Sequence, residues 1–122
     1  MKSYKDLDVY NLGLELFYLS HACTLKLPKY EMYELGSQLR RSADSVSTNI
    51  VEGYGRKRYK ADFIKFLTYS WASCLESVFH IEKIAKLYPE IIDDSDLLIS
   101  RYNELSAKIY NFIKYVEENW KT

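Results

Sequence analysis

The sequence predicts an all-α protein, an antiparallel up-and-down four-helix bundle that forms a single domain over residues 1–122 and assembles into a homo-oligomer. Three observations predict the bundle. Apolar residues recur every three or four positions in four long segments, which is the period of an α-helix. The 122 residues include only 4 Gly and 2 Pro, so few positions interrupt a helix. The breaks between the segments are short, and short connections favour antiparallel neighbours.

The first predicted helix runs from about Tyr4 to Leu25. Its start is marked by Ser3 and Asp6, whose side chains can accept hydrogen bonds from the free N–H groups of the first turn. Pro28 follows its end and cannot continue a helix. Two adjacent apolar seams predict a broad buried face; they contain Val9, Leu12, Leu16, Leu19 and Cys23, and Leu7, Tyr10, Leu14, Phe17 and His21.

The second predicted helix runs from about Tyr30 to Gly53. We expect Gly53 and Gly55 to end it, because glycine reaches the left-handed cap conformation without steric cost. Its apolar face is set by steps of three and four residues through Leu35, Leu39, Ser42, Val46, Ile50 and Gly53.

The third predicted helix runs from about Ala61 to Tyr88, and Pro89 ends it. Asp62 in its first turn suits the positive end of the helix dipole. Its main face consists of Phe63, Leu67, Ser70, Cys74, Val78, Ile81 and Ala85.

The fourth predicted helix begins near Ser95, with Asp93 and Asp94 as candidates for its N-cap. A heptad-like seam runs along it and is extended by Trp120. The seam consists of Leu98, Tyr102, Leu105, Ile109, Phe112 and Val116.

Composition excludes several kinds of protein. The chain has 17 Lys and Arg residues and 17 Asp and Glu residues, so its formal net charge is zero. No overall electric field therefore attracts nucleic acid or an anionic membrane, and any such binding needs a local basic patch. Cys23 and Cys74 fall in apolar helical patterns, which predicts buried free thiols in a reducing compartment, although geometry also permits a disulfide. We see no signal-peptide core and no apolar stretch near the roughly 18 residues of a membrane span. We therefore expect a cytoplasmic protein without a membrane partner.

The third predicted helix carries more apolar surface than one seam needs. Ile64, Trp71, Leu75 and Phe79 lie beside its main stripe. A bundle helix normally buries about a third to a half of its circumference, and soluble monomers rarely expose a large apolar patch. This surplus predicts self-association. The alternative is that the extra side chains only cover the edge of the bundle.

A strip of polar residues lies beside the apolar face of the second predicted helix. It consists of Gln38, Arg41, Ser45, Asn49 and Glu52. Half-desolvated groups at such a border are expected to be hydrogen-bonded. We interpret the strip, together with Glu76 on the next helix, as a network that fixes helix register or as a subunit contact. A ligand-binding or catalytic site is the alternative.

Several stretches of the chain resemble a known family. They are Gln38-Leu39-Arg40-Arg41-Ser42-Ala43, then Asn49-Ile50, then Glu52-Gly53 with Arg56. These resemble the family pattern Q-L-R-R-(A/S)-A, N-I-A-E-G and R. The run from Phe63 to Leu67, and Ser73 with Glu76, are similar to its F-(I/L)-x-F-L and S-x-x-E stretches. The family comprises bacterial four-helix-bundle proteins called intervening-sequence proteins, whose reading frames often lie within inserts in large-subunit ribosomal RNA genes.

The resemblance spans nearly the whole chain and implies a bundle assembled into a ring of five, with no established enzymatic activity. It also implies a distant relationship to the accessory variability proteins of retroelements, which partner a reverse transcriptase and bind nucleic acid. The expected partners are therefore further copies of the chain itself, and RNA or a nucleic-acid-handling protein.

A basic turn is predicted between the second and third helices. The basic turn is defined as Arg56, Lys57, Arg58 and Lys60, with Tyr54 and Tyr59 beside it. Phosphates attract such clusters, and tyrosine can stack on unpaired bases. We expect Arg40 and Arg41, one helix away, to support the same nucleic-acid contact. The alternative is a solvated loop, but in a ring each copy repeats the turn and weak contacts add through avidity.

Catalytic interpretations find little support. A di-metal bundle needs Glu-x-x-His pairs on two facing helices, whereas Glu76 and His80 are four residues apart and no second such pair exists. We expect His21 and His80 to be core or interface residues. A nucleophilic cysteine needs an electropositive, partly open setting, which the apolar positions of Cys23 and Cys74 do not predict. We expect no enzymatic activity, no metal and no cofactor.

Two functional hypotheses follow. The first is a non-catalytic scaffold that contacts RNA or a nucleic-acid-handling protein through the repeated basic turn. The second is an oligomeric protein-binding module with no nucleic-acid role. The clustered charges and the family resemblance favour the first, and the zero net charge favours the second.

Overall fold

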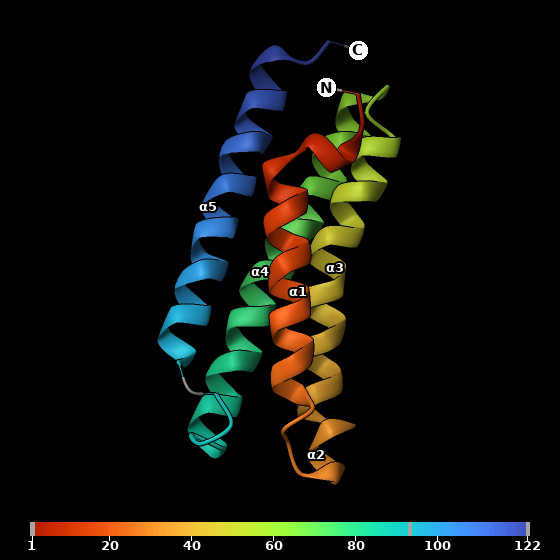
Figure 1. The fold of residues 1–122 in the computed structure, drawn as a ribbon. Coiled ribbons are helices and arrows are strands. Elements are labelled where there is room, and N and C mark those ends of the chain that lie inside the picture. The colour runs from red at the N-terminus through yellow and green to blue at the C-terminus, as the bar shows by residue number, and fades with distance from the viewer. Residues whose placement is uncertain (1, 93, 122) are drawn as a thin grey trace.

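The computed structural model describes residues 2–92 and 94–121, and the regular secondary structure of this part of the chain is entirely helical (Figure 1). The elements in chain order are a 3-10 helix η1 (Tyr4–Asp6) and the helices α1 (Asp8–Thr24), α2 (Lys29–Met32), α3 (Leu35–Gly55), α4 (Lys60–Leu87) and α5 (Ser95–Asn119). Four of them, α1, α3, α4 and α5, are long. The prediction of an all-α fold with four long helices is confirmed.

The long helices pack side by side, with α3 between α1 and α4, and α4 between α3 and α5 (Figure 1). The Ser42 hydroxyl lies 2.8 Å from the Ser77 hydroxyl, and Ser70 donates a hydrogen bond of 2.7 Å to the carbonyl of Val46. Along the direction in which residue numbers increase in α3, they therefore decrease in α4. The contact between α1 and α5 is less extensive than the contacts of α1 with α3, of α3 with α4 and of α4 with α5.

The core lies between the four long helices. Its side chains that are fully inaccessible include Leu16, Leu39, Val46, Ile50, Phe63, Leu67, Tyr102, Leu105 and Ile109. Tyr102 is the one phenol among them, and its hydroxyl lies 2.6 Å from the Ser20 hydroxyl and 3.2 Å from the Leu16 carbonyl oxygen. These contacts satisfy a polar group that would otherwise be costly to bury.

Two predicted helix boundaries are wrong. The capping box of Ser3 and Asp6 forms, but it caps η1, because Leu7 is extended and α1 begins only at Asp8. The second predicted helix is broken after α2 by a turn, and α3 starts at Leu35. This break is held by Arg40, whose guanidinium donates a 2.9 Å hydrogen bond to the carbonyl of Met32 at the end of α2.

The glycines at the end of α3 do not act as left-handed caps. None of the glycines has a positive φ, and α3 continues through Gly53 to Gly55. Gly53 is buried where α4 comes close, since a Cβ added there would lie 3.2 Å from the Cβ of Phe66. Gly53 thus permits a close approach of two helices rather than a turn.

The buried stripe of α4 differs from the predicted one. Val78 and Ala85 are only half-buried, and Ser77 and Ile84 take their places in the core. The prediction used two consecutive steps of four residues, which carry a stripe about 80° around the helix. Alternating steps of four and three keep it facing the same neighbours.

The predicted N-cap at Asp94 and the prediction of two buried free thiols are confirmed. The Asp94 carboxylate accepts a 3.0 Å hydrogen bond from the backbone N–H of Leu97 and caps α5, while Asp93 lies outside the described residues. Cys23 and Cys74 are buried free thiols, and burial raises the pKa of Cys74 to about 12. In the described ranges, no helix combines the length and the apolar character needed to cross a membrane.

Candidate nucleic-acid interface

The basic turn connects the end of α3 to the start of α4, and α5 holds it in place. The indole N–H of Trp120 donates a 2.7 Å hydrogen bond to the backbone carbonyl of Lys57. The Lys60 ammonium lies 2.6 Å from the carbonyl oxygen of Glu117, near the negative end of the α5 dipole. Two side chains therefore tie the turn to the last residues of α5, which gives its cations a defined position.

Three cations of the turn lie on aromatic rings. The Arg56 guanidinium lies 4.8 Å from the ring centroid of Phe66, and the Lys57 ammonium lies 3.8 Å from that of Tyr54. Arg58 is 5.8 Å from the centroid of Tyr59. Such contacts favour both the charge and the ring, and they keep the cations at the surface beside faces on which bases could stack.

Acidic side chains reach only part of the turn. Arg56 lies 3.7 Å from Glu52 and 3.8 Å from Asp62, and all three side chains are about half-exposed, so these ion pairs are weak. Neither Lys57 nor Arg58 forms an ion pair with a carboxylate in the described part of the chain. The turn therefore presents local positive charge on a chain whose net charge is zero.

Arg40 and Arg41 do not join the basic turn. They lie near the start of α3, and the 15 residue steps from Arg41 to Arg56 correspond to about 22 Å of helix. Arg40 is half-buried and donates hydrogen bonds to the Thr24 hydroxyl at 2.8 Å and to the Met32 carbonyl. Arg40 ties together α1, α2 and α3, whereas Arg41 is exposed, and the expected contact of these two residues with nucleic acid stays a prediction.

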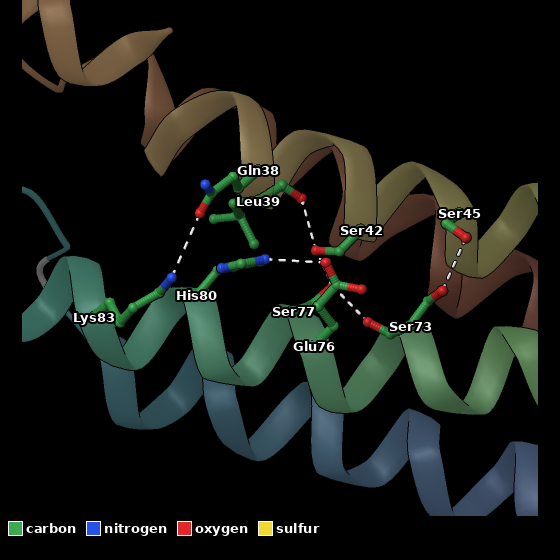
Figure 2. Close-up of polar contacts among 9 residues, drawn as sticks. All are labelled: Gln38, Leu39, Ser42, Ser45, Ser73, Glu76, Ser77, His80 and Lys83. Atoms are coloured by element: carbon green, nitrogen blue, oxygen red, sulfur yellow. Dashed lines mark hydrogen bonds and ion pairs between the residues drawn. The ribbon is translucent and has the colours of Figure 1, made fainter. Parts of the chain in front are cut away.

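Two residues of the polar strip of α3, Gln38 and Ser45, face α4, as Figure 2 shows. The Lys83 ammonium lies 3.4 Å from the Gln38 amide oxygen, and the Ser73 hydroxyl donates a 2.8 Å hydrogen bond to that of Ser45. Asn49 bonds within α3, to the hydroxyl and carbonyl of Ser45. The structure thus brings Gln38, Ser45 and Asn49 into a polar seam between the two helices, while Glu52 turns to Arg56.

A deeper layer of hydroxyl groups lies behind this strip and was missed in part by sequence reasoning. The Ser42 and Ser77 hydroxyls meet in the core (Figure 2), and each also lies within hydrogen-bonding distance of a carbonyl of its own helix, 3.1 Å from that of Leu39 and 2.9 Å from that of Ser73. Each hydroxyl has one proton, so one of the two donates to the other and its partner donates to a carbonyl. Ser42 stood on the predicted apolar face, but Ser77 did not, because the stripe was assigned to Val78. Small hydroxyl residues at core positions of both helices were the available signal.

The two histidines differ in position. His80 is buried, with its side chain 7% exposed, and its Nε2 lies 3.2 Å from a carboxylate oxygen of Glu76 (Figure 2). Its Nδ1 is buried without a hydrogen-bond partner among the described residues. His21 is exposed and lies against Phe17, so it is not a core residue, and an interface position for it stays a prediction. Within 2–92 and 94–121, no three His, Cys, Asp or Glu side chains gather as a metal site would require.

Comparison with protein families assigns the chain to a family. The family model described as 23S rRNA-intervening sequence protein matches residues 5–111. The chain belongs to this family. The match includes the polar strip and the whole basic turn, and it confirms the resemblance seen in the sequence. A comparison with curated proteins finds no match.

This intervening sequence protein exposes apolar side chains on the outer face of α4. Leu75 is 47% exposed and Phe79 is 56% exposed, and the Lys83 ammonium lies 4.5 Å from the Phe79 ring centroid. Trp71 and Ile64, which were predicted to share this surplus, are half-buried against the core. Two of the four predicted residues thus remain exposed in the single chain.

Proposed function

We propose that this intervening sequence protein is a non-catalytic homo-oligomer of antiparallel up-and-down bundles that acts as a scaffold and contacts RNA through the basic turn of each copy. The observation that carries the proposal is the exposed turn itself. Lys57 and Arg58 have no carboxylate partner among the described residues, and Trp120 and Lys60 fix the backbone that presents them. A positioned cation loses less freedom when a phosphate binds than a mobile one.

The aromatic rings of the turn support single-stranded RNA as the ligand. Tyr59 is 59% exposed and lies beside Arg58, so a base can stack on the ring while the guanidinium contacts the adjacent phosphate. One such contact is weak. Repetition of the turn around an assembly would add these contacts through avidity.

RNA binding can be tested with the triple variant Arg56→Gln, Lys57→Gln and Arg58→Gln. This variant keeps the Lys57 carbonyl to which Trp120 donates, so the fold of the turn should be unchanged. It also leaves Leu75 and Phe79 intact, so assembly should be unchanged. We expect single-stranded RNA affinity to fall, and the slope of log affinity against log salt to decrease by about 0.7 for each phosphate that the variant no longer neutralises. Wild-type affinity that does not depend on salt would contradict the proposal.

Self-association is supported by the exposure of Leu75 and Phe79, because soluble monomers seldom leave such apolar surface uncovered. The family resemblance favours a ring of five, with a mass of five times 14.5 kDa, or about 72 kDa. Light scattering after size exclusion measures this mass directly. Leu75→Glu with Phe79→Glu should lower it, whereas Tyr110→Glu, a change at a similarly exposed ring on α5, should not. A wild-type mass of 14.5 kDa would refute assembly.

The second candidate is an oligomeric protein-binding module with no nucleic-acid role. The exposed apolar residues of α4 and the net charge of zero favour it. Under this hypothesis the triple variant changes neither assembly nor any RNA interaction above background. In both cases the two buried free thiols fit a reducing compartment such as the cytoplasm.

A further inference from the structure

We propose that the RNA does not end at the basic turn but continues as a single strand along the outer surface between α3 and α4, as far as Arg41. This inference rests on the proposed function and extends it to a defined track. We call this surface the α3–α4 track. It consists of Arg41, Ser45, Asn49, Glu52 and Arg56 at the α3 side, and Tyr69, Ser73 and Glu76 on α4.

Two separated cations mark the ends of the track. Helical spacing puts Arg41 and Arg56 on the outer side of α3, and Arg56 pairs with Glu52. Arg41 also borders a hollow that it shares with Phe17 and His21 of α1 and with Asp44. Arg41 is exposed and has no ion pair with a described carboxylate. The separation of about 22 Å corresponds to about seven stacked nucleotides at roughly 3.4 Å each.

An exposed aromatic ring lies between these ends. Tyr69 is 45% exposed and stands one helical turn before Ser73, on the side of α4 that faces the polar strip. Its ring contacts Phe66 edge-on, with the two centroids 5.5 Å apart, and the Lys65 ammonium lies 6.0 Å from its centroid. A tyrosine on a surface lined with small polar groups is a platform on which a base can stack.

The polar groups beside Tyr69 are neutral and retain hydrogen-bonding capacity. The Asn49 amide nitrogen donates to the hydroxyl and carbonyl of Ser45, so the Asn49 amide oxygen is left to accept a hydrogen bond from a base. Ser45 and Ser73 bond to each other across the two helices. These residues suit a strand that is held by its phosphates and stacking more than by base-specific contacts.

Acidic groups on the track provide an internal test. Glu52 and Asp62 are both paired with Arg56. Glu76 is 58% exposed, and the one basic side chain near it among the described residues is His80, whose Nε2 lies 3.2 Å from its carboxylate. The charge of Glu76 should therefore oppose a phosphate passing between Tyr69 and Arg41. Glu76→Gln should tighten binding of a long oligonucleotide by about two- to fivefold at low salt and leave a short one unaffected.

The decisive experiment compares oligouridylates of four and nine nucleotides by fluorescence anisotropy. Only the longer strand can reach from the basic turn to Arg41. Arg41→Gln should weaken the nine-mer at least about fivefold, reduce its salt slope by about 0.7 and leave the four-mer unchanged. Lys108→Gln is the matched control, since Lys108 lies beside Asp6 and Asp8 on the opposite, α1–α5 side of the bundle. Tyr69→Leu should weaken the nine-mer by at least about fivefold as well.

The outcomes separate this inference from the proposed function. If both oligonucleotides bind and Arg41→Gln affects neither or both equally, the track is refuted and the basic turn stands. If affinity rises only beyond about twelve nucleotides, the strand bridges copies and the track within one chain is likewise refuted. If neither oligonucleotide binds, both proposals fail.

Discussion

Replacing Arg40 tests whether this arginine holds the fold or contacts nucleic acid. Its guanidinium fork donates to the Thr24 hydroxyl at 2.8 Å and to the Met32 carbonyl at 2.9 Å, and its side chain packs over Gly36. Arg40→Gln removes both hydrogen bonds because the shorter amide cannot span them. Thr24 keeps its bond to the His21 carbonyl, so the Met32 carbonyl is the main group left without its partner.

The expected loss of stability follows from these hydrogen bonds. A hydrogen bond from a charged donor contributes about 1.5–3 kcal/mol, and the partial exposure of Arg40 places the total near the lower end, at about 2 kcal/mol. The unfolding entropy of a chain of 122 residues converts 1 kcal/mol into about 4 °C, so the melting temperature should fall by about 8 °C. Arg40→Lys should recover little, because an ammonium cannot reproduce the planar fork.

Thermal unfolding followed by circular dichroism at one fixed protein concentration measures this change. Arg41→Gln is the matched control: the neighbouring arginine is exposed, and its replacement should change stability by less than about 0.5 kcal/mol. The structural role of Arg40 is refuted if Arg40→Gln has the same melting temperature as the wild type, or if Arg40→Gln and Arg41→Gln lose the same amount of stability.

Three further predictions concern the core. Tyr102→Phe leaves the Ser20 hydroxyl and the Leu16 carbonyl without their partner and should cost about 1–2 kcal/mol in denaturant unfolding, with an unchanged slope. Burial raises the pKa of Tyr102 above its ordinary value of 10.0, so the folded state keeps the phenol protonated. The protonated phenol of Tyr102 therefore contributes fully to the free energy of unfolding below about pH 10, and this contribution is lost as the pH rises further. If Tyr102→Phe loses stability as steeply as the wild type between about pH 9.5 and 11, this reasoning is contradicted. Gly53→Val should destabilise the fold by at least about 2 kcal/mol, because its Cβ meets Phe66 at 3.2 Å, whereas Gly55→Val, where an added Cβ meets nothing within 4 Å, should be nearly neutral in the same melt.

The candidate interface was predicted from sequence to different degrees in its parts. The basic turn is a local feature, because Arg56 to Lys60 are consecutive in the chain and sit between two helices that the periodicity places. The hydrogen bonds of Arg40 were not predicted, because its neighbours in the sequence say nothing of Thr24 and Met32, which the segment from the end of α1 through α2 brings to it. The contact of Trp120 with the turn was missed for the same reason, since it depends on which residue of another helix lies beside the indole.

The sequence by itself determined the helical class, the four long segments, the family and the position of the basic turn. Each of these depends on residues close together in the chain, where a helical period of about 3.6 and the rarity of Gly and Pro act directly. Only the tertiary structure decided the break before α3, the rotation of the buried stripe of α4, the inward direction of Arg40 and the exposure of His21. These depend on small differences in packing between helices, where a step of three or four residues changes which neighbour a side chain meets.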